Sequence, residues 1–322
     1  RRYPACGNLV PRDVASRAAK ERCDKGYGVN NTGLAVFLDF SEAINRLGKD
    51  VVAQRYGNLF DMYEEITDVS PYENPMMIYP AIHYTMGGIW VDYELMTSIK
   101  GLFAIGECNF SDHGANRLGA SALMQGLADG YFVLPYTIQN YLADQITVPR
   151  FSTDLPEFAA AEKAVQDKID WMMNIKGKKS VDSIHKELGH IMWEYVGMGR
   201  TAEGLKEGLK KLKEVRKEFE KELFIPGDKE GMNVELDKAI RLYDFITMGE
   251  LVAYDALNRN ESCGGHFREE YQTEEGEAKR DDENYFYVAC WEYQGSDEKE
   301  PVLLKEPLVY EAIKVQTRNY KS

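Results

Sequence analysis

The sequence predicts an α+β protein of several domains, and three observations carry that prediction. Short apolar runs bounded by glycine, such as Leu102–Ile105, predict buried strands within the first 150 residues. From about residue 151 to residue 260, apolar side chains recur at helical spacing in long stretches, which predicts an antiparallel helical bundle. Beyond Asn260 the pattern breaks into loops and short strands. With 322 residues, the chain has room for more than one such domain.

In the front of the chain, helical and strand-forming stretches alternate. Residues 13–27 carry apolar and small residues at helical spacing and end in Lys25-Gly26, a common helix exit. The run 34–40 is rich in β-forming residues and predicts a buried strand. A second helix is expected at about 41–66, followed by a Pro-rich linker over 72–80.

The segment from His83 to Glu107 has the composition of strands and tight turns. Its apolar run Leu102–Ile105 is flanked by glycines, which is typical of a strand buried on both faces. Small residues then dominate from Ala115 to Gly130. They predict a helix that packs unusually close to another group, such as a cofactor.

Four helical stretches make up the predicted bundle, at about 153–172, 180–198, 205–223 and 234–257. The first has one apolar stripe, formed by Phe158, Ala161, Val165, Ile169 and Met172. On the third, Lys and Glu alternate along the other face, which favours a solvated surface over a binding site.

The composition excludes several classes of function. Lys and Arg total 39 and Asp and Glu total 53, so the formal net charge is −14, which argues against a duplex nucleic-acid surface. The five scattered cysteines form no CxxC pair and no zinc-finger spacing, so we expect reduced intracellular thiols and no metal site. No apolar run reaches the roughly 18–20 residues that cross a bilayer, so the chain is not expected to insert into a membrane by itself. It starts at Arg1 without an initiator Met, which predicts the later part of a longer protein.

Two short segments contain residue types that could carry chemistry. Pro11–Asp13 lies at an expected helix start, where Arg12 is either a surface charge or a functional cation and Asp13 complements the helix dipole. His83 leads into the Gly87-Gly88 turn. It is either a strand-end residue or a hydrogen-bond donor that can change its charge near neutral pH.

A third segment, residues 106–123, combines more of these features. Glu107 follows the expected strand, so its carboxylate would lie at the carboxyl end of a sheet, where acids hold ribose hydroxyls. The stretch after Arg117 would place backbone amides at a helix start, where they can face an anion. We therefore predict a binding site in this segment.

Three motifs, in chain order, resemble those of the flavoprotein subunit of succinate dehydrogenase and fumarate reductase. They are His83–Gly88, Gly101–Glu107 and His113–Gly119. In addition, Pro11–Asp13 is similar to the part of that family's capping domain that carries a proton-donating arginine. The resemblance covers essentially the whole chain.

The resemblance implies four pieces. Residues 1–77 would finish a capping domain, residues 78–150 would complete an FAD-binding α/β domain, residues 151–260 would form the helical bundle, and residues 261–322 would form a small C-terminal region.

The resemblance also implies roles in the reaction. Arg12 would donate a proton to the substrate carbon, while His83 and Arg117 would hold the dicarboxylate, fumarate or succinate. A guanidinium ordinarily stays protonated, so it can act as an acid only if neighbouring acids reprotonate it, and Asp13 is the hypothetical relay. Fumarate reduction and succinate oxidation share this site, so both directions stay open.

For the cofactor, FAD, the resemblance implies three contacts. Glu107 resembles the family's flavin-binding acid, and Ala122 and Leu123 match positions whose backbone amides face the flavin. No Gly-x-Gly-x-x-Gly motif occurs in the chain, so the part that binds the FAD pyrophosphate is absent. We therefore expect the isolated chain to bind FAD weakly or not at all and to have no turnover.

The family also implies partners: an iron–sulfur subunit and a membrane cytochrome b subunit, with this peripheral subunit on the cytoplasmic face of the inner membrane. One alternative is a soluble L-aspartate oxidase, which shares two of the motifs. The tail, with Gly265–Tyr271 and Arg280–Tyr285, favours the dehydrogenase and reductase ending. The other alternative is a non-catalytic interaction module, in which Arg12, His83 and Arg117 would not converge.

Overall fold

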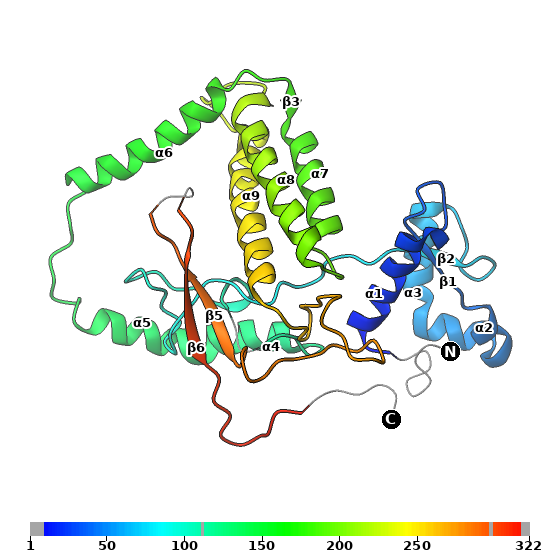
Figure 1. Ribbon diagram of the computed structural model, residues 1–322. Coiled ribbons are helices and arrows are strands. Elements are labelled where there is room, and N and C mark those ends of the chain that lie inside the picture. The colour runs from blue at the N-terminus through cyan, green and yellow to red at the C-terminus, as the bar shows by residue number, and fades with distance from the viewer. Residues whose placement is uncertain (1–9, 111–112, 296–298, 317–322) are drawn as a thin grey trace. The chain divides into compact units, whose positions relative to one another are not determined.

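The computed structural model describes residues 10–110, 113–295 and 299–316 (Figure 1). These residues divide into two compact units, the first ending at His83 and the second running from Tyr84 to Gln316. The predicted mixture of helices and strands is confirmed in both units.

The first unit is mainly helical. Its elements are α1 (Arg12–Arg22), the wide turn η1 (Cys23–Tyr27), β1 (Val36–Leu38), α2 (Ser41–Leu47), α3 (Lys49–Thr67) and β2 (Met76–Ile78). Gly26 has a φ of 76° and ends the first helical stretch, as its Lys-Gly exit predicts. The single helix expected over 41–66 is interrupted by Gly48, whose φ is 88°.

The prediction of a linker over residues 72–80 is wrong in part. Met76–Ile78 is a strand, and it pairs antiparallel with β1 so that Ile78 lies opposite Val36. Pro75 and Pro80 flank this strand without interrupting it, so both prolines are compatible with the ladder.

Aromatic side chains build the core of the first unit. Phe60 is fully buried and Val52 is 1% exposed. The ring of Phe60 meets Tyr72 at 4.8 Å and Phe40 at 5.0 Å between centroids, both edge to face. This cluster joins α3 to the segment that leads into β2.

The second unit begins with irregular chain, and here the prediction of a buried strand at Leu102–Ile105 is wrong. That stretch forms only an isolated bridge between Met96 and Phe103, and Leu102 is 49% exposed. A central strand needs hydrogen-bonded strands along its edges and packed layers over both faces, and among the described residues no strand runs beside this one. The short helical turn η2 (Gly106–Cys108) follows, and after it come α4 (Ser121–Ala128), η3 (Asp129–Val133) and α5 (Leu134–Ala143).

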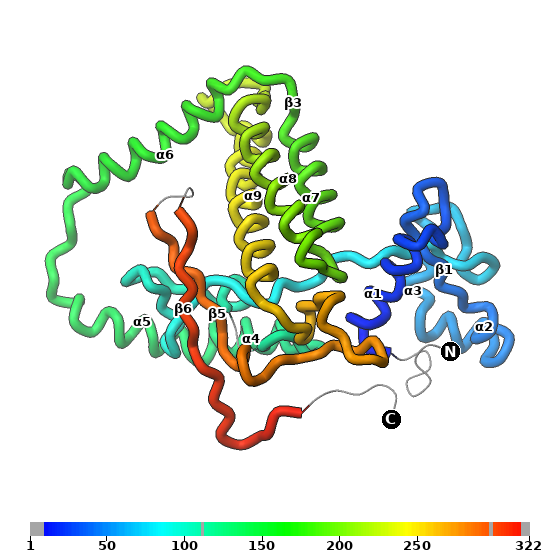
Figure 2. The backbone as a smooth tube through the Cα atoms, viewed as in Figure 1, coloured from blue at the N-terminus to red at the C-terminus, as the bar shows by residue number. Residues whose placement is uncertain are grey.

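The predicted bundle is confirmed for its last three helices, which lie side by side (Figures 1 and 2). The helices are α6 (Pro156–Asn174), α7 (Val181–Tyr195), α8 (Ala202–Glu222) and α9 (Val234–Asn258), with the short parallel strands β3 (Lys179–Ser180) and β4 (Leu223–Phe224). Side chains of Ser180, Thr201 and Asn233 cap the starts of α7, α8 and α9. The fully buried core includes Ile184, Leu205, Leu212, Phe219 and Ile246.

Only the end of α6 joins this core. Met172 is fully buried, whereas Phe158 is 48% and Val165 is 62% exposed. The single apolar stripe predicted for this helix is therefore present, but only its C-terminal end is covered by described residues. In Figure 1 the start of α6 extends away from α7–α9.

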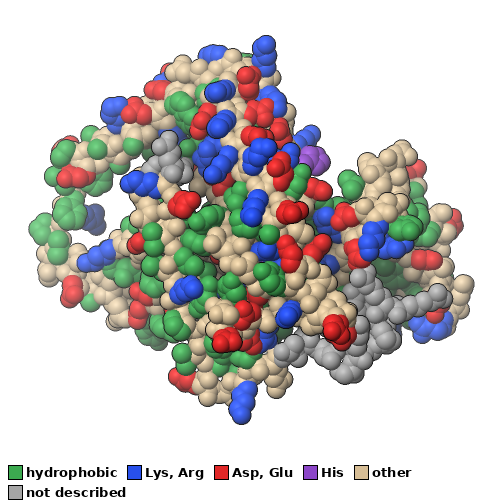
Figure 3. Space-filling model, in the orientation of Figure 1, with side chains coloured by type: hydrophobic (Ala, Val, Ile, Leu, Met, Phe, Trp, Pro, Cys, Tyr) green, Lys and Arg blue, Asp and Glu red, His purple; other side chains and the backbone are tan. Residues whose placement is uncertain are grey.

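Charged side chains of both signs intermingle over the outer face of the bundle (Figure 3). This agrees with the prediction of a solvated face. Between the helices, Arg216 on α8 pairs with Glu250 on α9, with 3.0 Å between Nε and Oε1.

The tail closes with an antiparallel hairpin of β5 (Tyr287–Glu292) and β6 (Val302–Pro307). The indole Nε1 of Trp291 donates to Asp255 on α9 at 2.7 Å, which ties the hairpin to the bundle. None of the described helices combines the length and the apolar character that crossing a membrane requires.

Candidate functional site

A polar network holds α4 against the turn that precedes it. The Asp129 carboxylate accepts from the backbone amide of Gly106 at 2.9 Å and from the Asn109 side chain at 3.3 Å. Gln125 donates to the Gly106 carbonyl at 3.2 Å and to Asn109 Oδ1 at 2.9 Å. Gln125 is 6% and Asn109 is 2% exposed, so these bonds form away from water and fix the Gly106 turn to the helix.

The Glu107 side chain connects the Gly106 turn to the segment that follows His83. Its Oε1 accepts from the backbone amide of Thr85 at 2.9 Å, and the Tyr84 hydroxyl donates to Gln125 Oε1 at 3.1 Å. A side chain at Gly88 would put its Cβ 2.5 Å from the Cys108 carbonyl oxygen, so the close approach of the two segments requires glycine.

Arg117 lies in the same region, on the loop that leads into α4. Its backbone amide donates to the Met86 sulfur at 3.0 Å, and its guanidinium lies 4.6 Å from the centre of the Tyr84 ring. Its Nη1 donates to the Leu118 carbonyl at 3.0 Å. Its Nε is buried without a hydrogen-bond partner, and within the described residues no carboxylate pairs with this guanidinium. This cation can therefore accept an external carboxylate.

The start of α4 offers backbone donors. Ala120 has a φ of 64°, an unusual conformation for a residue with a Cβ, and the helix begins directly after it. Ser121 Oγ donates to the Leu118 carbonyl at 2.7 Å. The amides of Ala122 and Leu123 fall in the first turn, where an α-helix supplies no internal acceptor. They can face an electron-rich ligand atom, and this donor set fits a flavin ring.

The predicted site residues fall into both units. Glu107, Arg117, Ala122 and Leu123 belong to the second unit. His83 is exposed and is the last residue of the first unit.

Arg12 also belongs to the first unit. It is the first residue of α1 and is exposed, and Asp13 beside it pairs with Arg17 at 3.4 Å. The convergence of Arg12 and His83 on Arg117 stays a prediction. In the part of the chain that the structure describes, no group of His, Cys, Asp or Glu could hold a metal ion.

Sequence reasoning missed the residues that support this site. Tyr84 and Met86 lie inside a motif that was singled out for His83 alone. Gln125 and Asp129 are four residues apart in a helical stretch of small and apolar residues. That spacing puts both polar side chains on one face of the helix. It is the feature of the sequence from which these two residues could have been predicted.

Comparison with known proteins places these observations in a family. A family model described as an FAD binding domain matches residues 1–123, and one described as the fumarate reductase flavoprotein C-terminus matches residues 185–320. The chain belongs to the family of succinate dehydrogenase and fumarate reductase flavoprotein subunits. The predicted family and its FAD cofactor are thereby confirmed.

Individual relatives agree with this family. The succinate dehydrogenase flavoprotein subunit of Bacillus subtilis is 34% identical over 271 residues, covering 84% of the chain and 45% of the relative. The fumarate reductase flavoprotein subunit of Serratia is 32% identical over 279 residues, covering 86% and 44%. A solved quinol–fumarate reductase with menaquinol has a TM-score of 0.77 at 27% identity, covering 97% of the chain and 51% of that structure's chain. The chain thus spans about half the length of these relatives.

Proposed function

We propose that this chain is part of a catalytic flavoprotein subunit that interconverts fumarate and succinate with FAD. The observation that carries the proposal is Arg117, a partly buried guanidinium without a carboxylate partner among the described residues. It lies on the loop before the amide-rich start of α4, and Met86 and Tyr84 contact it from the segment that also meets Glu107.

Three residues of the second unit would hold the cofactor. One oxygen of Glu107 binds the Thr85 amide, and the other can accept from a sugar or ribityl hydroxyl. The first-turn amides of Ala122 and Leu123 would donate to the flavin ring, helped by the helix dipole. When bound, FAD supplies the hydride chemistry.

Substrate binding and protonation are assigned to one residue of the second unit and two of the first. Arg117 would bind one carboxylate through two parallel N–H donors, which a lysine could not reproduce. His83 would hold the other end of the dicarboxylate, and Arg12 would protonate the substrate carbon. Asp13 would return the proton to Arg12, and in the structure it pairs with Arg17. Holding both ends of the substrate aligns its central carbons for reaction.

We also propose that the isolated chain is inactive. It contains no Gly-x-Gly-x-x-Gly motif for the FAD pyrophosphate. Large apolar side chains along α4 and η3 are exposed: Leu123 by 78%, Met124 by 67%, Tyr131 by 73% and Phe132 by 74%. An apolar face of this kind is normally covered by another polypeptide surface, so the rest of the FAD-binding domain is expected to pack there.

The four-part organisation is proposed with it. Residues 1–77 complete the capping domain, 78–150 the FAD-binding domain, 151–260 form the bundle and 261–322 the C-terminal region. An iron–sulfur subunit and a membrane cytochrome b subunit are the proposed partners, on the cytoplasmic face of the inner membrane. Similarity to a quinol–fumarate reductase supports these partners.

The test uses the full-length subunit that contains this chain, with its FAD. Succinate and, separately, L-aspartate are added anaerobically to the oxidised protein while the flavin absorbance is recorded. Bleaching by succinate alone supports the proposal, and bleaching by aspartate transfers the protein to the oxidase branch. Arg117→Lys should abolish the response to succinate. The matched control, Arg241→Lys, changes an exposed arginine on α9 and should leave it intact.

A further inference from the structure

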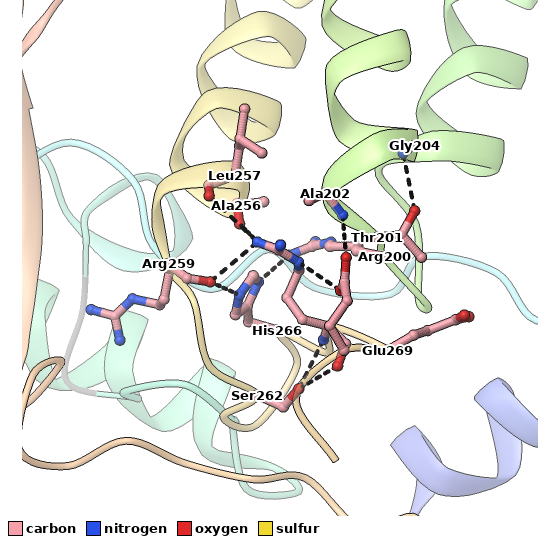
Figure 4. Close-up of polar contacts among 12 residues, drawn as sticks. Arg200, Thr201, Ala202, Gly204, Ala256, Leu257, Arg259, Ser262, His266 and Glu269 are labelled. Atoms are coloured by element: carbon pink, nitrogen blue, oxygen red, sulfur yellow. Dashed lines mark hydrogen bonds and ion pairs between the residues drawn. The ribbon is translucent and has the colours of Figure 1, made fainter.

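A cluster of arginines and a histidine, with Arg268 buried and the others half-buried, joins the ends of the bundle helices (Figure 4). Arg268 is 1% exposed, and its Nη1 donates to the Ala256 carbonyl at the end of α9 at 3.0 Å. Its Nε donates to Glu270 at 3.2 Å, and Glu270 also accepts from the amide of Ala202 at the start of α8. These hydrogen bonds attach the segment after α9 to the end of α9 and to the start of α8.

His266 lies at the centre of this cluster, and both ring nitrogens are used. Its Nδ1 is 2.7 Å from Nη1 of Arg200, and its Nε2 is 2.9 Å from the Arg259 carbonyl oxygen. A guanidinium can only donate and a carbonyl can only accept. Nδ1 must therefore be the acceptor and Nε2 must carry the proton, which is a neutral imidazole.

The charges around the ring agree with a neutral imidazole. Burial and the neighbouring Arg200, Arg268 and Arg259 lower the pKa of His266 to about 4. Burial likewise lowers the pKa of Arg200 to about 10.

His266 also closes a tight turn. The amide of Cys263 donates to the His266 carbonyl at 2.8 Å, and the amide of His266 returns a bond to Cys263 at 3.0 Å. Gly264 and Gly265 form the tip, with Gly264 at a φ of 57°.

The tip of this turn contacts the loop that carries Arg117. The amide of Gly265 donates to the Ala115 carbonyl at 2.8 Å. A Cβ on Gly264 would lie 2.1 Å from that same oxygen, and one on Gly265 would lie 2.9 Å from Met86 Cε. Met86 in turn accepts from the Arg117 amide at 3.0 Å. The turn therefore meets the 115–117 backbone directly at Ala115 and indirectly through Met86.

We propose that His266 is a positioning residue for the dicarboxylate site, because it anchors the Gly264–Gly265 turn that holds the backbone of Ala115 and Arg117. The proposal deepens the proposed function, since it rests on Arg117 as a substrate ligand. His266 itself needs no contact with substrate. Its two hydrogen bonds connect the turn to Arg200, between α7 and α8, and to Arg259, directly after α9. Through the turn, the loop before α4 is connected to the ends of these helices.

The test compares three variants of the full-length, FAD-loaded subunit. His266→Ala removes both ring bonds. His266→Gln is neutral and can both accept from Arg200 and donate to the Arg259 carbonyl, so it is the rescue variant. His190→Ala changes an exposed histidine on α7 and is the matched control.

Two readouts are needed. One is the affinity for malonate, a non-reactive dicarboxylate, measured from the change in flavin absorbance, together with KM and kcat for succinate. The other is hydrogen–deuterium exchange of the amides in 113–119, which needs no ligand. His266→Ala should weaken malonate binding and raise KM by on the order of tenfold, with a smaller change in kcat and faster exchange in 113–119. His266→Gln and His190→Ala should stay near the parent protein.

Unchanged affinity and unchanged exchange in His266→Ala would overturn the proposal. So would an equal loss of protection throughout the bundle with no separate effect on 113–119, because His266 would then be a stabilising residue only. If the parent protein does not bind malonate, the proposed function fails, and the exchange readout still decides whether His266 positions the loop.

Discussion

The neutral state of His266 should make the stability of the bundle ends depend on pH. Folding lowers the pKa of this imidazole from 6.5 to about 4, so the unfolded segment binds a proton more readily than the folded one. The stabilisation is therefore fully present above pH 6.5 and is lost as the pH falls toward 4. One pKa unit corresponds to about 1.4 kcal/mol, so the segment should lose about 2 kcal/mol between pH 7.5 and pH 5.

Hydrogen–deuterium exchange of residues 262–271 measures this loss. After correction for the intrinsic exchange rates, 2 kcal/mol corresponds to protection factors about thirtyfold smaller at the lower pH. His266→Gln cannot titrate and should lack this part of the decrease, while His190→Gln, on the exposed face of α7, should retain it. An equal decrease in the parent protein and in His266→Gln would refute the assignment of a neutral His266.

Three other perturbations test the architecture. Leu212→Ala removes a fully buried side chain from the bundle and should lower the free energy of unfolding by about 3 kcal/mol in chemical denaturation. Arg216→Ala removes the partner that lies 3.0 Å from Glu250, whose side chain is 19% exposed, and should lower the free energy of unfolding by about 2 kcal/mol in the same assay. A decrease of less than about 0.5 kcal/mol would show that this ion pair does not stabilise the bundle. Met86→Leu keeps the volume but removes the sulfur acceptor of the Arg117 amide, so exchange of that amide should accelerate while the bundle amides keep their protection.

The bundle was the most predictable part of the fold. Apolar residues at helical spacing predict α7, α8 and α9 to within a few residues, because each helix buries one face against its neighbours. The same reasoning fails for the start of α6, where Phe158 and Val165 form an apolar stripe without a described surface to cover it. Periodicity indicates which face of a helix can be buried, and only a partner decides whether it is.

Strands were less predictable for a related reason. Leu102–Ile105 has the composition of a central strand but lacks neighbouring strands among the described residues, so it remains irregular. Met76–Ile78 has prolines on both sides and nevertheless pairs with β1. A strand is defined by hydrogen bonds to another segment, and the local sequence carries little information on that segment.

The sequence by itself determined the family and the three packed helices of the bundle. It also supplied Glu107 and Arg117 as candidates for binding a flavin and a dicarboxylate, and these two roles stay predictions. The family follows from the resemblance of three motifs, and the helices follow from the local spacing of apolar residues. Only the tertiary structure decided what holds those side chains in place: Tyr84 against Gln125 of α4, and the Gly264–Gly265 turn against Ala115. Such supports join residues far apart in the chain, and their energy comes from burial and hydrogen bonds that exist only after the segments have met.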